Sequence, residues 1–179
     1  EATAVLARAF PRTVRKALGT RLFERAWKYL KKVSTVKDSM VAVSVGRHRD
    51  GVTAMHDATE GGVVAAVLEL ANASRLGAEL ELDAFPISPE TEGICQLFQI
   101  DPLISVSEGS LIVACKPHKT TVILNRLKSA GINGQVIGQL TSRTHSVYGT
   151  NQRGRTRLRY PRADPYWRAY WSAVRNGWK

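Results

Sequence analysis

The sequence predicts an α/β (α+β) fold in which helices are layered on a mixed sheet. Two observations carry this prediction. Strand-length apolar or alternating stretches recur at 52–55, 78–82, 111–115 and 135–140, and segments of helical period separate them. The 179 residues, 44% of them hydrophobic, suffice for one substantial domain with its own core. No apolar run reaches the roughly 20 residues of a membrane span, so no membrane partner is predicted.

The first part of the chain, residues 1–50, predicts a helical lead-in. A first helix should stop at Pro11, and the next segment repeats apolar residues at a period of 3.6 as far as Leu30, with a basic outer face. Phe23 and Trp27 fall on the apolar stripe, so we expect them in the core rather than stacked on bases. A further short helix, capped by Ser34 or Thr35, is expected to contain Val36, Met40 and Val41.

Residues 51–142 are predicted to form the core. The strand Val52–Met55 leads through a turn into a helix from about Glu60 to Ser74, for which Gly77 is the expected stop. Continuous apolar residues at 111–115 predict a strand buried on both faces. The remaining elements expected here are a half-buried strand at 78–82, a helix at 90–98, a helix at 120–130 and a strand at 135–140.

Residues 143–179 predict a basic hairpin and an aromatic helix. The hairpin should pair 144–148 with 155–160 around Asn151-Gln152-Arg153-Gly154. Asp164 followed by Pro165 predicts a helix start. The aromatic face of that helix is expected to pack on protein; its members are Trp167, Tyr170, Trp171, Val174 and Trp178.

The net charge of +11 is unevenly distributed along the chain. Residues 1–50 carry 12 basic and 4 acidic residues and 141–179 carry 9 and 1, whereas 51–140 carry 5 and 10. Basic flanks are compatible with a nucleic-acid surface, with a cleft for a phosphorylated small molecule, or with a solvated surface. Two cysteines 20 residues apart, without a metal-ligand pattern, predict reduced thiols in a cytoplasmic protein.

The strongest local signal is the turn between Asp57 and Gly62. Paired glycines at a helix start expose backbone N–H groups, and Thr59 can cap the helix or bond an oxyanion. The alternative is a purely structural turn in which Asp57 and Thr59 cap the helix and the glycines permit close packing. The residues alone leave these two interpretations about equal.

A wider pattern favours the functional interpretation. The chain resembles the C-terminal domain of the AIR synthase-related superfamily, most strongly over 52–140. That superfamily includes AIR synthetase, the phosphoribosylformylglycinamidine synthase large subunit, selenophosphate synthetase, thiamine-monophosphate kinase and the hydrogenase maturation carbamoyl dehydratase. The segments that carry the resemblance are His56 to Gly62, Glu69, Asn72-Ala73-Ser74, Phe85-Pro86-Ile87, Ile100 to Leu103, Ser107 to Leu111 and Val136-Ile137-Gly138.

The resemblance implies a role in an interdomain active site. Complete members bind ATP and Mg²⁺ in an N-terminal domain that forms a dimer core, and we expect that domain to be the partner missing from this chain. The C-terminal domain closes the cleft and holds a phosphorylated or activated substrate. We therefore expect the parent protein to be an ATP-dependent enzyme and homodimer, and the fragment alone to be inactive. The residues that this role would involve are Asp57, Thr59, Gly61 and Gly62, followed by His56, Glu60 and Glu108.

Some residues depart from the pattern of individual members. Carbamoyl dehydratases usually have Pro and Arg where Ala58 and Glu60 stand here, and they end in a reactive Cys that is absent from this sequence. Asp57, Asp101 and Glu108 are possible Mg²⁺ ligands, but their wide spacing predicts no metal site. Two alternatives without catalysis remain open: a nucleic-acid-binding module built on the basic flanks, with Arg153, Arg155, Arg157 and Arg159 on phosphates, and a protein-interaction module that uses the aromatic helix.

Overall fold

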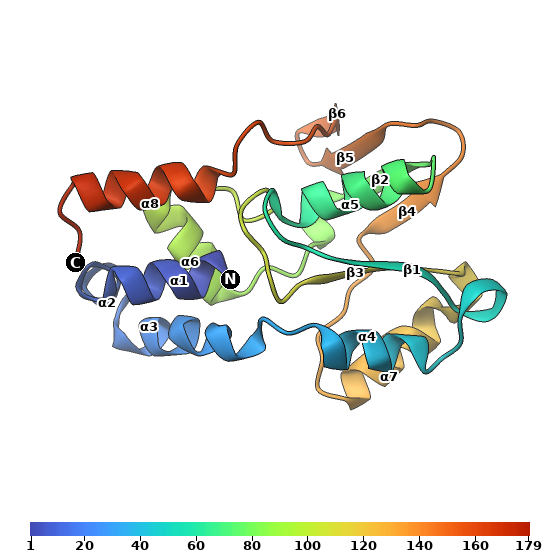
Figure 1. Cartoon of the computed structure of the whole chain (residues 1–179), viewed down its shortest axis with the longest axis horizontal. Helices are drawn as coiled ribbons and strands as arrows, with labels where there is room; N and C mark the ends of the chain where they lie inside the picture. Colours follow the sequence, from blue (N-terminus) through green and yellow to red (C-terminus); the bar gives the residue numbers. More distant parts are fainter.

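A computed structural model describes residues 1–179 and arranges them in three groups of elements (Figure 1). The α/β prediction is confirmed. The helices are α1 (Ala2–Ala9), α2 (Pro11–Leu18), α3 (Thr20–Trp27), α4 (Val36–Val43), α5 (Gly62–Ala73), α6 (Pro89–Phe98), α7 (Thr120–Ser129) and α8 (Pro165–Arg175). The strands are β1 (Val52–Asp57), β2 (Gly77–Glu81), β3 (Leu111–Cys115), β4 (Gly138–Thr141), β5 (Val147–Asn151) and β6 (Gly154–Arg157). Short 3₁₀ turns are η1 (Lys28–Lys32), η2 (His48–Asp50), η3 (Leu82–Ala84) and η4 (Pro117–Lys119).

The first group is a helical cluster that joins the two ends of the chain. Helices α1, α2, α3, α6 and α8 share a core of 14 buried residues. Phe10 from the start of the chain and Phe98 from α6 both pack on Trp178, at ring centroid separations of 6.3 and 5.0 Å. The Thr13 amide also donates to the Lys179 carbonyl oxygen at 2.6 Å. The lead-in helices are thus held against the C-terminal helix rather than standing apart.

A buried carboxylate fastens α6 to α3 inside this helical cluster. Glu90 is only 6% exposed, and its two oxygens bond to different partners. Arg25 forms an ion pair with Oε1, and the Tyr29 hydroxyl donates to Oε2 at 2.8 Å. A buried carboxylate with both oxygens engaged avoids the cost of an unpaired charge.

The second group is a four-stranded mixed sheet in the order β4-β2-β5-β6. Strand β2 pairs antiparallel with β4 and parallel with β5, and β5 continues antiparallel into β6. Helix α5 packs on this sheet through Val67 and Ala71, which meet Ala78 and Leu80 of β2 and Val147 of β5. The predicted hairpin around 151–154 is confirmed, and its first strand also extends the sheet.

The third group is the antiparallel pair β1 and β3 with helices α4 and α7. Register matches His56 with Ile112 and Asp57 with Leu111. Ala42, Val52, Ile123 and Leu127 form a small buried cluster here. The pair lies between the helical cluster, the larger sheet and the α4–α7 layer (Figure 1), so the end of β1 is central in the molecule.

Three helix predictions need correction. The expected continuous helix to Leu30 breaks at Gly19, whose φ of +82° separates α2 from α3. Phe23 is buried as expected, but Trp27, the last residue of α3, is 43% exposed and carries the Arg8 guanidinium over its ring at 5.8 Å. Gly77 does not stop α5: the helix ends at Ala73, and Gly77 begins β2.

Two strand predictions also differ from the structure. All five residues of β3 are half-buried rather than buried on both faces, because the strand has only β1 as a neighbour and borders a cavity. The strand expected from Gln135 begins at Gly138. Its partner β2 ends at Glu81, whose amide donates to the Ile137 carbonyl. Residues 135 and 136 therefore have no residue of β2 opposite them with which to pair.

None of the helices combines the length and the apolar character needed to cross a membrane. Both cysteines are free: Cys95 is buried in the helical cluster and Cys115 is half-buried at the end of β3.

Candidate functional site

The turn after β1 and the loop before β3 are held together by the backbone. The Ala58 amide donates to the Ser110 carbonyl at 2.9 Å, and the Ser107 amide donates to the Thr59 carbonyl at 3.2 Å. Ala58 is fully buried between them, whereas Thr59 is exposed. Two segments that lie about fifty residues apart in the sequence therefore form one structural unit, with Glu108 and Gly109 in the tip of its second half.

The glycine amides of the turn are satisfied within the chain, which corrects the expectation of free donors. The Gly61 amide donates to Asp164 Oδ2 at 2.8 Å, and the Gly62 amide donates to the Thr59 carbonyl at 3.2 Å. Asp164 is 7% exposed, so its carboxylate is already a buried anion at the start of α5. The chain itself thus supplies the hydrogen-bond acceptor that a bound anion would otherwise provide at the start of α5.

The missing side chains of Gly61 and Gly62 allow close internal packing. Both residues have positive φ, +78° and +69°. A Cβ on Gly62 would lie 2.6 Å from the Leu103 carbonyl oxygen, and one on Gly61 would lie 3.2 Å from Cγ of Pro161. The spaces that the sequence suggested for a ligand are filled by residues 103–105 and by the segment that follows β6.

His56 belongs to a small polar network on the exposed side of the turn. Its Nε2 lies 2.6 Å from Glu69 Oε2, and the Tyr160 hydroxyl donates to Glu69 Oε1 at 2.9 Å. The hydrogen bond from His56 is the main cause that lowers the pKa of Glu69. Asp57 is exposed, with Oδ1 3.9 Å from His56 Nδ1. The network fixes one edge of the imidazole and leaves Nδ1 facing Asp57.

Glu60 turns toward α8 rather than toward the helix start. Its Oε1 accepts a hydrogen bond of 3.0 Å from Trp167 Nε1. The side chain is exposed, so the indole N–H fixes its direction without burying its charge. The acid that stands at the mouth of the turn is therefore drawn to one side.

Glu108 differs from the other acids because one of its oxygens is buried without a partner. Oε2 is inaccessible to solvent and makes no hydrogen bond. Burial, and then the neighbouring Glu1 carboxyl, raises the pKa of Glu108. A carboxyl with a raised pKa can hold a proton and donate a hydrogen bond, and perturbed groups of this kind concentrate at functional sites.

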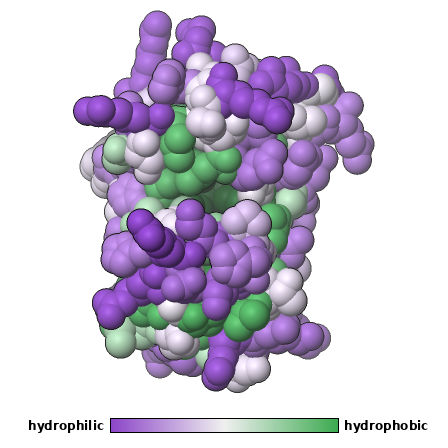
Figure 2. All heavy atoms as spheres, turned by 90° about the vertical axis from the view of Figure 1, so that its right-hand side faces the viewer, coloured by the Kyte–Doolittle hydropathy of each residue, from purple (hydrophilic) through white to green (hydrophobic).

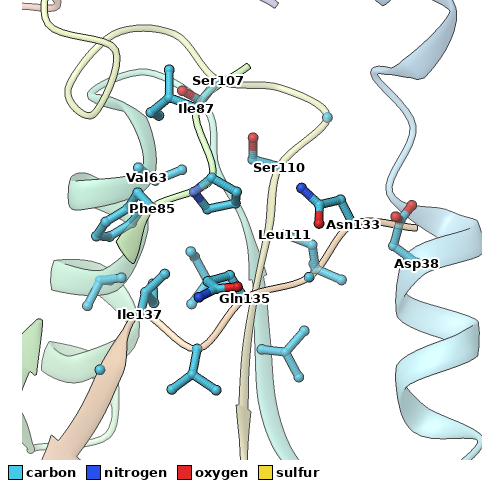
Figure 3. Close-up of a pocket in the computed structure, with 18 of the residues that line it drawn as sticks. Asp38, Val63, Phe85, Ile87, Ser107, Ser110, Leu111, Asn133, Gln135 and Ile137 are labelled. Atoms are coloured by element: carbon cyan, nitrogen blue, oxygen red, sulfur yellow. The ribbon is translucent and has the colours of Figure 1, made fainter. Parts of the chain in front are cut away.

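A cavity of about 890 Å³ adjoins this carboxyl. Figure 3 shows Phe85, Leu111 and Ile137 on its walls, with the polar side chains of Ser107, Ser110, Asn133, Gln135 and Asp38 around it. Figure 2, which views the molecule from the right-hand side of Figure 1, shows a hollow with hydrophobic walls on this face. Apolar walls with a few polar groups are typical of small-molecule pockets.

The possible magnesium ligands are not brought together. Asp101 Oδ1 accepts the Leu103 amide at 2.8 Å and closes a turn. No three His, Cys, Asp or Glu side chains lie close enough to hold a metal ion.

Two non-catalytic functions, nucleic-acid binding through the hairpin arginines and protein interaction through the aromatic helix, depend on residues that are partly engaged in internal contacts. The Arg155 guanidinium bonds both oxygens of Glu79, at 2.7 and 3.2 Å, and lies 3.5 Å from the Tyr148 ring centroid. On α8, Tyr166 is buried and Tyr170 packs on Phe10, as expected for a helix docked on its own core. The predicted docking face is nevertheless partly wrong: Trp167, Trp171 and Val174 lie on the outer side of α8 and are about half exposed, because Tyr166 and Ala173 take the buried side.

Sequence reasoning missed the contribution of residues 160–167 to the turn. Asp164 was recognised only as the cap of α8, a role that its Oδ1 does perform by accepting the Tyr166 amide at 2.8 Å. The pair Asp164-Pro165 is the only signal in the sequence, and it indicates a helix start without showing that Asp164 Oδ2 accepts the Gly61 amide.

Comparison with known proteins gives one family and several relatives. Residues 20–150 match the family described as AIR synthase related protein, C-terminal domain. The carbamoyl dehydratase HypE of Escherichia coli K12 is 35% identical over 121 residues, which cover 64% of this chain and 35% of that protein. A crystal structure of E. coli HypE superposes with a TM-score of 0.64 at 30% identity, covering 73% of this chain and 40% of that one. A structure of HypE in complex with ATP, 20% identical, shares the fold with a TM-score of 0.58 over 82% of this chain and 41% of its own. The chain spans about a third of the length of its curated relative.

Proposed function

Because the chain belongs to the family of AIR synthase related protein C-terminal domains, we propose that it is the substrate-side domain of an ATP-dependent enzyme. In this proposal the domain closes a cleft against an N-terminal domain that supplies the ATP and Mg²⁺ sites. The turn at 56–62 and the loop at 107–110 hold a phosphorylated or otherwise activated small molecule. The complete protein works as a homodimer, and this chain alone does not turn over ATP.

The observation that carries the proposal is the backbone pairing of the turn with the loop. Two hydrogen bonds, Ala58 to Ser110 and Ser107 to Thr59, join two of the segments that carry the family resemblance. The same loop borders the cavity and carries the unpartnered Glu108 oxygen. A preorganised pair of loops beside a cavity is the arrangement that a substrate-holding site requires.

The structure suggests how the proposed roles divide among the residues. Gly61 and Gly62 shape the turn, and the exposed Thr59 offers a hydroxyl group. His56 lines the turn with its Nε2 engaged by Glu69 and its Nδ1 facing Asp57. Glu108, which lines the cavity with one carboxyl oxygen buried and unpartnered, is the acid placed to bond a polar group of the substrate. The rim acids are directed to neighbouring side chains: Asp57 Oδ1 lies 3.9 Å from His56 Nδ1, and Glu60 Oε1 accepts the Trp167 indole N–H at 3.0 Å.

An NMR titration tests this proposal on the 179-residue chain. AMP is added to the ¹⁵N-labelled protein, with adenosine as the ligand control that lacks phosphate. We expect AMP, but not adenosine, to shift the amide signals of Thr59 and of Ser107 to Ser110. Signals of the basic hairpin at Arg153 and Gly154 report non-specific attraction of the anion.

Three results would contradict the proposal. Shifts confined to the hairpin would show a general electrostatic effect, and equal shifts with adenosine would show that the phosphate is not recognised. If the amide signals of Thr59 and of residues 107–110 do not shift in the natural chain, in Asp164→Ala or in Asp164→Asn, the proposed substrate site does not exist. A Glu108→Gln variant, which keeps the side-chain shape, should change the response of the loop more than that of the hairpin.

A further inference from the structure

Residues 160–167 form a strap that lies across the glycine turn. The chain leaves β6, passes over the start of α5 and enters α8 (Figure 1). The Tyr160 hydroxyl donates to Glu69 at 2.9 Å, and Trp167 Nε1 donates to Glu60 at 3.0 Å. Between these two contacts, Pro161 covers Gly61. The strap lies outside residues 20–150, which match the family model.

Asp164 is the central contact of the strap. Oδ2 accepts the Gly61 amide and Oδ1 accepts the Tyr166 amide, both at 2.8 Å. One carboxylate therefore lies at the N-terminal ends of both α5 and α8, where the helix dipoles and free amides favour a negative charge. At 7% exposure it leaves a second anion no access to the Gly61 amide.

We propose that the strap is an intramolecular competitor for the substrate anion, with Asp164 as the group that the substrate must displace. This inference rests on the proposed function, because it concerns the same turn. With the strap closed, an anion reaches only Thr59 and the 107–110 loop. With the strap open, the Gly61 amide becomes available and the anion gains a donor at the positive end of α5.

The outer contacts of the strap are of a kind that can open. Tyr160, Arg162 and Ala163 are exposed, and the hydrogen bonds at the two ends of the strap join exposed side chains. Only Asp164 and Tyr166 are buried, and Tyr166 also belongs to the helical cluster. Lifting residues 160–164 thus requires the loss of the Asp164 contact, but the rest of α8 can stay in place.

The test measures AMP affinity by the same amide shifts in the natural chain and in Asp164→Ala and Asp164→Asn. Removal of the competing carboxylate should tighten binding about ten- to hundredfold, the range expected for one charge-assisted hydrogen bond. The Gly61 amide should begin to respond to AMP. Asp164→Asn, which keeps a cap oxygen for Tyr166, should tighten binding less than Asp164→Ala but in the same direction.

A matched control separates strap opening from the loss of a local side-chain-to-backbone hydrogen bond. Thr144 Oγ1 accepts the Ser146 amide at 3.0 Å, as Asp164 Oδ1 accepts the Tyr166 amide, so Thr144→Ala removes a contact of the same kind away from both the turn and the cavity. It should lower stability and leave AMP affinity unchanged. Trp167→Phe, which keeps an aromatic ring and loses only the bond to Glu60, should give a smaller gain in affinity.

The outcomes distinguish the two proposals. If the natural chain responds to AMP and neither Asp164 variant binds more tightly, the strap proposal is wrong and the proposed function stands. If the variants bind tightly and the natural chain weakly or not at all, both are supported. If no variant responds at the turn or at the loop, the proposed function fails and the strap proposal fails with it. If Thr144→Ala tightens binding as much as Asp164→Ala, the effect comes from general loosening of the fold and the strap proposal is overturned.

Discussion

Replacement of Gly62 by alanine gives the sharpest test of how the turn is built. The residue has a φ of +69°, and an added Cβ would lie 2.6 Å from the Leu103 carbonyl oxygen and 2.8 Å from that of Ser105. Both neighbours are backbone atoms, so they cannot move aside like the end of a flexible side chain. The Leu103 carbonyl also accepts the Val64 amide at 3.0 Å, so displacing it strains the first turn of α5.

The expected loss has two parts. A left-handed conformation costs an alanine about 1–2 kcal/mol relative to glycine. Forcing a methyl group into a filled space adds about 1–3 kcal/mol. Gly131→Ala isolates the first part, because Gly131 has a φ of +73° and nothing lies within 4 Å of its Cβ position. We therefore expect Gly62→Ala to lower the free energy of unfolding by about 2–5 kcal/mol and Gly131→Ala by about 1–2 kcal/mol.

Urea unfolding followed by tryptophan fluorescence measures both variants under the same conditions. A lower midpoint with an unchanged slope would show a loss of native stability. Equal losses for the two variants would refute the close packing of Gly62 on residues 103–105. The glycine would then be free to serve ligand approach alone, which was the other interpretation of the paired glycines.

Three further predictions concern titration, thiol reactivity and charge. Burial opposes ionisation of Glu90, but the hydroxyl and guanidinium groups bonded to it outweigh burial and hold its pKa below the usual value. A lowered pKa stabilises the fold above the unfolded-state pKa, so this stability should be lost as the pH falls from about 5 to 3. Glu90→Gln should flatten that part of the urea-midpoint profile, and an unchanged profile would contradict the assignment. Burial raises the pKa of Cys95 to about 12, so iodoacetamide should label only the half-exposed Cys115 in the folded chain, and mass spectrometry of labelled Cys95 would show otherwise. Arg155→Ala should barely change retention on heparin, because that guanidinium is already ion-paired, whereas loss of the exposed Arg157 should lower the eluting salt concentration. A large effect of Arg155→Ala would disprove the pairing.

Local patterns in the sequence were sufficient for much of the fold. The hairpin around 151–154 and the start of α8 at Asp164 were predicted because turn and capping residues act over a few positions. Helix α5 and strand β2 followed from their apolar periods. The failures occur where the outcome depends on a distant partner: β3 is half-buried because it lacks a second neighbouring strand, and β4 begins late because β2 ends early.

The candidate site shows the same limit more strongly. The sequence identified His56 to Gly62 and Glu108, but no local pattern shows that Asp164, 103 positions further on, satisfies the Gly61 amide. The unpartnered Glu108 oxygen depends on burial that only the assembled loops create. Glu60 lies at the mouth of the turn, where its charge opposes a phosphate, and only the structure shows that the indole of Trp167 draws it aside. Residue types predicted the location of the site, whereas contacts across the whole chain determine which donors are available.

The helical cluster also constrains when the chain can finish folding. The apolar faces of helices α1, α2 and α3 are closed by α6 and finally by Trp178. During synthesis their core stays incomplete until α8 and Trp178, far along the sequence from them, have left the ribosome. Contacts of such long sequence separation are slow to form and leave apolar surface open meanwhile. A ribosome that stalls before α8 would release a chain whose sheets can form but whose first helices have lost their last covering partner.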